Sequence, residues 1–574
     1  MRRAVLLLCC LAASAVALSA QTFTTLAGFD GANGSNPMAS LIQATDGNLY
    51  GTTYSGGTNG LGAVFKVTPR GTLSILYNFC SQQNCMDGTS PYAGLVQAKD
   101  GNFYGTTSAG GDSNAGTVFK ITPAGGLTTL YSFCTVAFCA DGQFPDGTLL
   151  QATDGNFYGT TSAGGSAYFG GTVFKITPAG DLTTLYSFQG TDGEAPLAGL
   201  AQGTDGNFYG TTSQGGSFSD GTVFKTTPGG ALTTLYNFSG DTDGYAPQGV
   251  LVQAGDGNFY GTTAYGGDNN GGTVFKVTPE GGLSTFYAFC TQFDCSDGAF
   301  PAAGLSLASD GNFYGTTLYG ESNSYGTVFK LSPAGILTTL HSFNYSDGAY
   351  PHAGVVQATD SDFFGTTSYG GIDNCSYGCG TVFRLDAGLA RFLLSVNENG
   401  SGMVSSFDGR IYCGTICSYS YAPETTVRLS AIPAPGYTLS GWTGCDNVNG
   451  SYCSVTMAAA KNVTTNFAAA NITLTSLIFK PSYVKGGRLS TGTLTLSGPA
   501  PSGGVAIALS SDHPEVAHPP SFVFVPGNQS SAEFAVKTLP VKSNTTVSII
   551  ATAGNSQVSG TLTVGTTSLP PSLK

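Results

Sequence analysis

Two sets of residues in this chain have types and spacings that could do chemistry, and the first is a recurring aspartate. An Asp-Gly pair stands shortly before a proline in seven places. Seven carboxylates brought together could bind cations or sugar hydroxyls. Asp-Gly before Pro is equally a common turn, so a purely structural role explains the same pattern. These candidate binding residues are Asp30, Asp87, Asp141, Asp192, Asp243, Asp297 and Asp347.

The second set is a group of twelve cysteines that fall into six close pairs. An even number of cysteines in local pairs is typical of disulfides in an exported protein. The alternative is zinc, which needs about four ligands, but none of the four histidines stands beside a pair. We predict six disulfides and no metal or cofactor. The pairs are Cys80/Cys85, Cys134/Cys139, Cys290/Cys295, Cys375/Cys379, Cys413/Cys417 and Cys445/Cys453.

Known catalytic templates do not match the chain. It lacks the His-Glu-x-x-His pair, the Gly-x-Ser-x-Gly nucleophile turn, a phosphate-binding loop and a dinucleotide fingerprint. A pair of carboxylates for glycoside chemistry could still meet across a ring of strands. We therefore assign no catalytic residues. The sequence favours a protein that is not an enzyme, and it leaves the question open.

Charge excludes one class of partner. Charged residues make up 10% of the chain and the net charge is −13, whereas soluble domains carry about 25% charged residues. A nucleic-acid-binding protein needs a basic surface, so we expect no nucleic-acid partner. No stretch after the first twenty residues is apolar for long enough to span a membrane. We expect a monomer without a transmembrane segment.

The elements that must position these residues repeat along the chain. The string "DGNFYGTT" begins at Asp100, Asp154, Asp205, Asp256 and Asp310, with variants at Asp46 and Asp360, in steps of 54, 54, 51, 51, 54 and 50 residues. One copy reads "GLVQA", "NFYGTT", "GTVFKIT" and "LTTLYSF", which are four β-prone runs separated by turns. Four strands per copy predict the blade of a β-propeller. "DGN" predicts a two-residue type I′ hairpin between the first two strands.

The two ends of the repeat region predict a closed ring of seven blades. Residues 23–29, "FTTLAGF", match a fourth strand, and the last copy stops at the third strand "GTVFRLD", residues 380–386. The N-terminal strand can therefore complete the seventh blade and remove two exposed sheet edges. A solenoid would need only polar caps.

Two further positions recur once per copy. A third-strand Lys or Arg, such as Lys120, is expected to be solvated or paired with an Asp. A first-strand Gln is expected to line the channel or to bond to neighbouring backbone; it is Gln43, Gln97, Gln151, Gln202, Gln253 and Gln357, with Leu307 in the sixth copy.

The motifs "DGNFYGTT", "GTVFK" and "DGxxPxAGLxQ" resemble the GloVer tandem repeats of exported bacterial proteins, over roughly residues 21–386. The resemblance implies a secreted or surface protein and brings no catalytic residues. Residues 389–468 contain "GWTGC" and "CSVTM" and resemble a divergent InlB B-repeat, in which Trp442 is expected to anchor the core. Residues 469–565 alternate like sandwich strands and resemble a bacterial Ig-like domain.

The ends of the chain complete the predicted organisation. Residues 1–20 have the charged, apolar and small-residue order of a secretory signal peptide. The predicted domains are the signal peptide at 1–20, the propeller at 21–388, the InlB-like module at 389–468, the Ig-like sandwich at 469–565 and a flexible tail at 566–574.

One face of the predicted ring gathers the variation between copies. The loops between strands two and three and the crossovers between blades lie on this face, and they hold four of the cysteine pairs. Binding residues on rigid scaffolds are usually found in such loops, although the disulfides could simply stabilise longer loops. We predict a secreted or cell-surface protein that binds an extracellular glycan or protein. The alternative is a propeller hydrolase or lyase that acts on polysaccharide.

Overall fold

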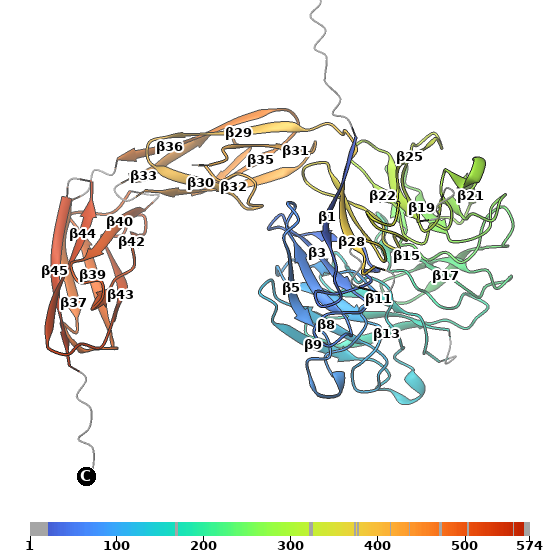
Figure 1. Ribbon diagram of the computed structural model, residues 1–574, viewed down its shortest axis with the longest axis horizontal. Helices are drawn as coiled ribbons and strands as arrows, with labels where there is room; N and C mark the ends of the chain where they lie inside the picture. The colour runs from blue at the N-terminus through green and yellow to red at the C-terminus, as the bar shows by residue number, and fades with distance from the viewer. Residues whose placement is uncertain are drawn as a thin grey trace, which may run out of the picture. The chain divides into compact units, whose positions relative to one another are not determined.

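The computed structural model describes residues 21–166, 170–320, 325–371, 375, 378–413, 415–434, 437–469, 473–501, 504–554 and 556–566. The predicted signal peptide and nearly all of the predicted tail lie outside these residues. The described chain is strand and loop almost throughout (Figure 1), as the composition predicted. It divides into two compact units, the first comprising residues 21–44 and 48–390 and the second comprising residues 45–47 and the chain from Arg391 onward. No helix in the described residues is long and apolar enough to cross a membrane.

In its described part the first unit consists of four-stranded antiparallel sheets, one for each sequence copy. The first strands are β2 (Ile42–Gln43), β6 (Val96–Gln97), β10 (Leu150–Gln151), β14 (Ala201–Gln202), β18 (Val252–Gln253), β22 (Ser306–Leu307) and β26 (Val356–Gln357). The second strands are β3 (Leu49–Thr53), β7 (Phe103–Thr107), β11 (Phe157–Thr161), β15 (Phe208–Thr212), β19 (Phe259–Thr263), β23 (Phe313–Thr317) and β27 (Phe363–Thr367).

The remaining strands complete copies 1 to 7, numbered in chain order. The third strands are β4 (Ala63–Val67), β8 (Thr117–Ile121), β12 (Thr172–Ile176), β16 (Thr222–Thr226), β20 (Thr273–Val277), β24 (Thr327–Leu331) and β28 (Thr381–Asp386). The fourth strands are β5 (Leu73–Asn78), β9 (Leu127–Ser132), β13 (Leu182–Ser187), β17 (Leu232–Asn237), β21 (Leu283–Ala288), β25 (Leu337–Ser342) and, for copy 7, β1 (Thr22–Gly28).

Strand β1 takes the fourth place in the sheet of copy 7. It pairs antiparallel with β28, in a register that runs from Thr22 opposite Asp386 to Gly28 opposite Thr381. The Phe23 ring stacks on His341 at a centroid distance of 3.5 Å and also contacts Phe383. The first strand of the chain is therefore held to the last copy both by its backbone and by an aromatic side chain.

The Phe-Tyr pair of the motif joins neighbouring copies. Successive side chains of a strand point to opposite faces of the sheet, so the Phe of β7 faces the preceding copy and the Tyr faces the next. The Tyr50 ring lies 4.3 Å from Phe103, and Tyr104 lies 4.2 Å from Phe157. Equivalent pairs join each later copy to the next as far as Tyr314 and Phe363. The repeated motif therefore specifies the contact between blades as well as the turn.

The glycine after that Phe-Tyr pair is required by close packing inside each sheet. A Cβ atom on Gly261 would lie 2.5 Å from Phe275 Cζ and 2.6 Å from Leu251 Cδ2. The same approach to a third-strand Phe occurs in every copy, for example at Gly105 and Gly365. This position therefore has no room for a side chain, which explains why every copy has "YG" or "FG".

The hairpin at "DGN" differs from the predicted two-residue type I′ turn. Gly101 has a φ of 81°, but Asp100 is not among the residues with positive φ. Ala98 N–H bonds to Asn102 O at 2.9 Å, and Gly101 N–H bonds to Ala98 O at 2.9 Å. The loop therefore contains three residues, and only its last position needs glycine. The type I′ prediction is wrong because the hairpin closes one residue earlier than the motif suggested.

The core of the first unit consists of clusters that each lie between two consecutive copies. Phe79 of copy 1 packs in one cluster with Phe119 of copy 2. A further cluster contains Phe364 and Val382 of copy 7 together with Leu49 of copy 1. Copies 7 and 1 are therefore in contact, just as neighbouring copies are.

The recurring Gln forms hydrogen bonds between copies. Gln151 Oε1 accepts a hydrogen bond from Lys99 N–H of the preceding copy at 3.0 Å, and its Nε2 donates to Gly155 O in its own hairpin. Gln43 of copy 1 likewise accepts from Thr359 N–H of copy 7 at 2.8 Å. These contacts match the interpretation in which the recurring Gln bonds to neighbouring backbone.

All six predicted disulfides are present: Cys80–Cys85, Cys134–Cys139, Cys290–Cys295, Cys375–Cys379, Cys413–Cys417 and Cys445–Cys453. In the three crossovers that carry a pair, a short 3₁₀ turn leads into the second cysteine. These turns are η1 (Gln83–Cys85), η2 (Ala137–Cys139) and η3 (Phe293–Cys295). Each of these three disulfides therefore closes a compact loop.

The first part of the second unit contains two four-stranded sheets. One sheet contains β29 (Phe392–Asn399), β31 (Ser418–Tyr421), β33 (Tyr437–Thr443) and β36 (Lys461–Ala469). The other contains β30 (Gly402–Ser406), β32 (Thr426–Pro433), β34 (Asn447–Asn449) and β35 (Tyr452–Thr456). Trp442 is partly buried against the core that these sheets share, as its predicted anchoring role requires.

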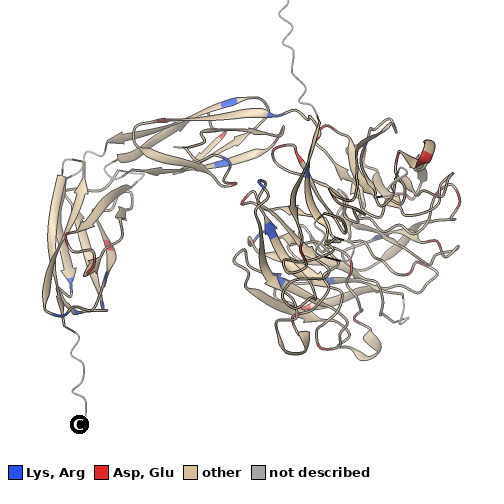
Figure 2. Ribbon diagram, in the orientation of Figure 1, with Lys and Arg blue, Asp and Glu red and all other residues tan. Residues whose placement is uncertain are grey.

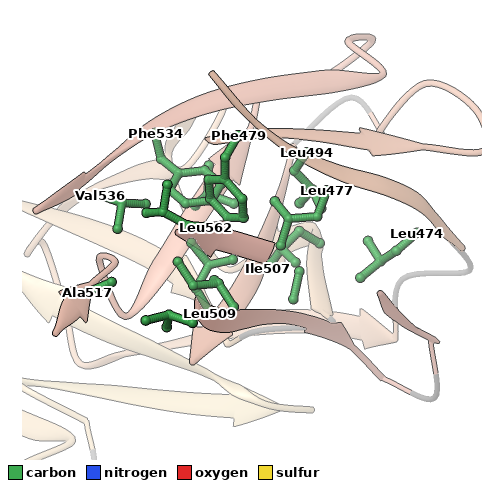
Figure 3. Close-up of a cluster of buried hydrophobic side chains, with 14 of the residues drawn as sticks. Leu474, Leu477, Phe479, Leu494, Ile507, Leu509, Ala517, Phe534, Val536 and Leu562 are labelled. Atoms are coloured by element: carbon green, nitrogen blue, oxygen red, sulfur yellow. The ribbon is translucent and has the colours of Figure 1, made fainter. Parts of the chain in front are cut away.

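The second part has sheets of four and five strands. The four-stranded sheet contains β37 (Leu474–Lys480), β39 (Leu489–Leu496), β41 (Ala517–His518) and β43 (Ser531–Thr538). The other contains β38 (Tyr483–Lys485), β40 (Val505–Ser511), β42 (Phe522–Val525), β44 (Thr545–Ala553) and β45 (Ser556–Gly565). Residues of both sheets, such as Phe534 and Leu562, form one core (Figure 3).

Candidate binding face and its aromatic groove

The loops that the sequence placed on one face are joined to each other in every copy. In each, a crossover residue pairs by an isolated β-bridge with a residue of the loop between strands two and three, for example Thr89 with Ala109 and Tyr245 with Tyr265. We call this surface the loop-bearing face. It carries the disulfide loops, whereas the two short hairpins of each sheet lie at the opposite ends of the strands.

The fourth cysteine pair, Cys375–Cys379, forms the predicted disulfide and packs into the core. Cys379 is completely buried, with 0% of the residue exposed. It packs with Phe29 and Val382 in the hydrophobic cluster that joins copies 7 and 1, and Cys375 is partly buried against the same cluster. Cys379 forms the predicted disulfide with Cys375, and its side chain is part of the core.

The last cysteine pair is also part of a core and not of a binding surface. Cys453 lies in β35, is 0% exposed, and packs with Val455 in the core of the first part of the second unit. Cys445 is partly buried against this core. Cys453 forms the predicted disulfide with Cys445 and is a core residue. The alternation of side chains along β35 places it inside, which the spacing of the pair alone did not reveal.

The seven candidate aspartates lie in the crossovers and hold them in shape. Asp141 accepts hydrogen bonds from Tyr131 OH at 2.8 Å and from Thr135 N–H at 3.1 Å. Asp87, Asp243 and Asp297 make the corresponding contacts with their own loops.

These four carboxylates are buried, with at most 7% of each residue exposed. A ligand outside the protein does not reach them without a rearrangement of the loop. Their contacts match the interpretation in which the Asp-Gly pair forms a structural turn, and not the one in which the aspartates bind a ligand.

The other three crossover aspartates also bond within their own loops, but with different partners. Asp192 accepts a hydrogen bond from Tyr186 OH and one from Gln189 N–H. Asp347 lies 3.0 Å from His341 Nε2, where most copies have a tyrosine. Asp30 is exposed and accepts a hydrogen bond from Asn33 N–H at 2.8 Å.

The fourth-strand tyrosines that donate hydrogen bonds to these aspartates stay protonated at neutral pH. Burial, together with the hydrogen bond to Asp243 and the charge of that carboxylate, raises the pKa of Tyr236 to about 12. The same combination with Asp192 raises the pKa of Tyr186 to about 12. The phenol therefore remains a hydrogen-bond donor to the carboxylate over the physiological pH range.

A different set of aspartates lies in the first hairpin of each copy. Asp205 Oδ2 lies 2.8 Å from Lys225 Nζ and accepts a hydrogen bond from Tyr209 OH at 2.9 Å. Partial burial opposes ionisation, but the hydrogen bonds from Lys225 and Asn207 outweigh it and lower the pKa of Asp205. This is the Asp pairing expected of the third-strand Lys, and it lies away from the loop-bearing face.

A small cavity of about 100 Å³ is lined by residues of all seven copies. Each copy contributes the segment that follows the crossover proline, such as Tyr92 to Gly94 and Ala302 to Gly304. The described residues of this lining include one carboxylate, Asp146, and one imidazole, His352. Most of the lining is alanine, glycine and backbone.

Asp146 is the carboxylate of that lining, and its pKa is shifted. It accepts hydrogen bonds from Ser108 OH at 2.6 Å and from Ser162 OH at 2.7 Å. Burial raises its pKa, and the two serine hydrogen bonds oppose that rise only in part. Burial also lowers the pKa of His352. Both groups are therefore biased towards their neutral forms.

A larger groove opens on the loop-bearing face between copies 5 and 6. Its volume is about 650 Å³, and its aromatic lining residues are Tyr265, Phe300 and Tyr319. Gln248 and Ala302 line both this groove and the central cavity. Residues 294–295 of the third disulfide loop also line the groove. The groove therefore lies between the central cavity and a loop that a disulfide stabilises.

The aromatic rings of the groove belong to a longer row. Phe300 is edge-on to Tyr265 and to Tyr319, with both centroid distances 5.2 Å. Tyr245 stacks on Tyr265 at 5.1 Å, and Tyr350 lies 5.6 Å from Tyr319. Such edge-to-face contacts fix the orientation of each ring.

Backbone hydrogen bonds hold the same residues in place. Tyr245 N–H bonds to Tyr265 O at 2.9 Å, and Leu318 N–H bonds to Phe300 O at 3.1 Å. Phe300 has a φ of 60° and Tyr350 a φ of 53°. Positive φ is unusual for a bulky residue and is costly unless the surroundings impose it. The aromatic row is therefore built on a rigid and locally strained backbone.

Sequence reasoning missed this groove, although a signal was present. At the loop position of Tyr265 and Tyr319, the first four copies have Ser55, Ala109, Ala163 and Gln214. The strands on either side of this loop are nearly identical from copy to copy, so an aromatic residue confined to copies 5 to 7 is a departure from the repeat. Its contact with a crossover residue about twenty positions earlier required the structure.

Comparison with family models identifies the repeats. The model described as the Gloeobacter/Verrucomicrobia repeat matches residues 14–168, 135–294 and 285–420. The chain belongs to this family. The family therefore covers the first unit, in agreement with the motif resemblance. The divergent InlB B-repeat domain matches residues 393–471, which confirms that assignment.

Solved structures resemble the chain only remotely. A quinonprotein alcohol dehydrogenase-like protein from Bacteroides thetaiotaomicron is 15% identical with a TM-score of 0.35, covering 54% of this chain and 66% of the other. An ulvan lyase of polysaccharide lyase family PL25 is 10% identical with a TM-score of 0.36, covering 61% and 94%. PorZ of Porphyromonas gingivalis is 11% identical with a TM-score of 0.30, covering 92% and 75%. Likenesses at this level carry no functional argument, and the comparison with curated proteins finds no match.

Proposed function

We propose that the chain is a secreted or cell-surface protein that binds an extracellular glycan or protein without catalysis, through its loop-bearing face. The observation that carries this proposal is the aromatic groove, a preformed hollow on the face where the copies differ most. Six disulfides support an oxidising, extracellular location. In this proposal the seven crossover aspartates position the loops of the binding face.

We further propose that the first unit is a closed seven-bladed propeller. Three contacts between copies 7 and 1 support closure: the pairing of β1 with β28, the shared hydrophobic cluster and the Thr359–Gln43 hydrogen bond. A central cavity lined by every copy is expected of a ring and not of an open solenoid. A closed ring supplies the rigid scaffold that the binding loops require.

The remaining parts of the proposal concern the ends of the chain. Residues 1–20 direct export and are removed. The InlB B-repeat module and the following two-sheet domain, proposed to be Ig-like, act as spacers or additional adhesive modules. The protein is proposed to act as a monomer, with no cofactor and no nucleic-acid partner.

A polysaccharide hydrolase or lyase is the alternative function. It would require two carboxylates that converge on the channel mouth. Among the described residues that line the central cavity and the groove, the carboxylates are Asp146 and Asp294. Asp146 is buried near the axis, and Asp294 is exposed in a disulfide loop. We favour binding over catalysis because these two carboxylates line different hollows, Asp146 the central cavity and Asp294 the groove.

One paired experiment tests the proposed function. The full chain from residue 21 is applied to arrays of glycans and extracellular proteins, and the same polymers are assayed for cleavage. We expect saturable binding with no turnover. Turnover that is abolished by Asp146→Asn or Asp294→Asn would contradict the proposal and establish the alternative.

A further inference from the structure

We propose that the groove between copies 5 and 6 binds a chain of uncharged sugars by stacking on Tyr265, Phe300 and Tyr319. This inference rests on the proposed function and names its ligand class and its site. The three rings are neighbours in space, although the chain separates Tyr265 from Tyr319 by a full repeat.

The chemistry of the lining fits a sugar polymer. The C–H face of a pyranose packs against an aromatic ring, while its hydroxyls need hydrogen-bond partners at the edges. Tyr265 and Tyr319 are 38% and 41% exposed, so ring surface is open to a ligand. Their phenols, the Gln248 amide and the Asp294 carboxylate provide polar groups around the rings. A purely apolar partner would bury these polar groups without giving them hydrogen-bond partners.

The charge of the groove selects uncharged polymers over acidic ones. Its described lining includes one charged side chain, the carboxylate of Asp294, and no Lys, Arg or His. The chain as a whole has a net charge of −13, and charged residues are sparse along the ribbon (Figure 2). A sulfated or uronic-acid polymer would be repelled and would find no cation there.

The shape of the groove is the third argument. A volume of about 650 Å³ lies within the usual range for small-ligand sites, about 300–1,000 Å³. The groove lies beside the central cavity, with which it shares the lining residues Gln248 and Ala302. An open trench of this size suits a few consecutive units of a slender polymer. A protein partner would need a wider surface, about 800 Å² on each side.

The other copies supply substitutions that this fold already tolerates. At the position of Tyr265 and Tyr319, copies 2 and 3 have alanine, and at the position of Phe300, copy 1 has Asn36 with a φ of 54°. Tyr265→Ala, Tyr319→Ala and Phe300→Asn therefore remove the rings while keeping residues native to the repeat. Tyr319→Phe keeps the ring and removes only the hydroxyl.

The experiment measures binding of the full chain from residue 21 to soluble polysaccharides by affinity electrophoresis and calorimetry. The probes are uncharged xyloglucan, galactomannan and mixed-linkage β-glucan, with alginate and heparin as anionic probes. We expect at least one uncharged polymer to bind and neither anionic polymer to do so. Tyr265→Ala and Tyr319→Ala should each weaken binding at least tenfold, and Tyr319→Phe less than threefold. Tyr54→Ala, an exposed tyrosine of copy 1 outside the groove, is the matched control.

The outcomes separate this inference from the proposed function. Binding that all variants retain, or binding of the anionic probes alone, would overturn the inference and leave a binding protein whose site lies elsewhere. Binding to an extracellular protein but to no polysaccharide would also overturn it. Binding to neither class would overturn the proposed function itself. Equal thermal midpoints of the variants and the parent chain show that any loss of binding is local.

Discussion

At the scale of single residues, the same side-chain type serves different purposes according to where the repeat places it. The hairpin aspartates are ionised partners of Lys and Tyr, whereas the crossover aspartates Asp87, Asp141, Asp243 and Asp297 are buried anchors of their loops. Asp146 differs from both, because only serine hydroxyls offset its burial. The surroundings of each aspartate, and not its residue type, therefore decide whether its carboxylate is accessible to a ligand.

Asp146 should make the stability of the protein fall as the pH rises, whereas an acid paired with a cation makes stability rise with pH. The pKa of Asp146 in the folded state is raised above the value of about 3.9 expected for the unfolded chain. The folded state therefore binds the proton more tightly, and this group's contribution to stability falls as the pH rises from about 4 towards the raised value. Asp146→Asn removes that loss, so the variant should gain thermal stability relative to the parent chain between pH 4 and pH 7.

Thermal midpoints of both proteins across this pH range provide the measurement. Asp181→Asn, in an exposed hairpin, is the control substitution. A constant difference between Asp146→Asn and the parent would show that Asp146 does not titrate as described.

Gly261 tests the packing inside a blade. Gly261→Ala forces a shift of Phe275 or Leu251, and overpacking of this kind costs about 1–3 kcal/mol. We expect a clearly lower thermal midpoint. Gly282→Ala is the matched control, because its nearest neighbour would be an ordinary 3.5 Å contact with Thr278. Equal midpoints for the two variants would contradict the packing account of the motif.

At the scale of elements, the pairing of β1 with β28 supports closure of the ring. Strand β1 lies about 350 residues away in sequence from its partner β28, yet it forms the fourth strand of that sheet. Deletion of residues 23–29 should expose edges at β28 and remove the Phe23 contacts. We expect the truncated chain to aggregate, as measured by light scattering after size-exclusion chromatography. Deletion of residues 567–574 is the control, and a truncated chain that stays monomeric with an unchanged thermal midpoint would refute closure.

The sequence predicted these elements well because they repeat. Each strand run, the orphan "FTTLAGF" segment and each local cysteine pair could be found by comparing one copy with the next or by spacing alone. The three-residue hairpin was missed because an Asp-Gly pair fits more than one loop length. The groove was missed because Tyr265 and Phe300 meet only when two neighbouring copies fold against each other. The spacing of the cysteines predicted their pairing, but it could not show that Cys379 and Cys453 are buried, because the side of the strand on which a sulfur lies depends on the fold.

At the scale of the whole molecule, small β units with local disulfides form a chain suited to conditions outside the cell. Each disulfide joins cysteines only 4 to 8 positions apart, so it stabilises one segment without linking distant parts. Thiol titration of the unreduced, unfolded chain from residue 21 should find essentially no free cysteine. Full reduction should then release twelve thiols. Several free thiols before reduction would contradict an oxidised, extracellular state.

The central claim is that the loop-bearing face, through its aromatic groove, is where the protein meets its ligand. Hydrogen–deuterium exchange of the full chain from residue 21, with and without the polymer that it binds most tightly, tests this claim most directly. We predict slower exchange in peptides that cover residues 245–248, 264–266, 299–302 and 318–320. We predict no change in the opposite hairpins at residues 99–102 and 204–207. Protection of those hairpins, or of residues after 391 alone, would contradict the account.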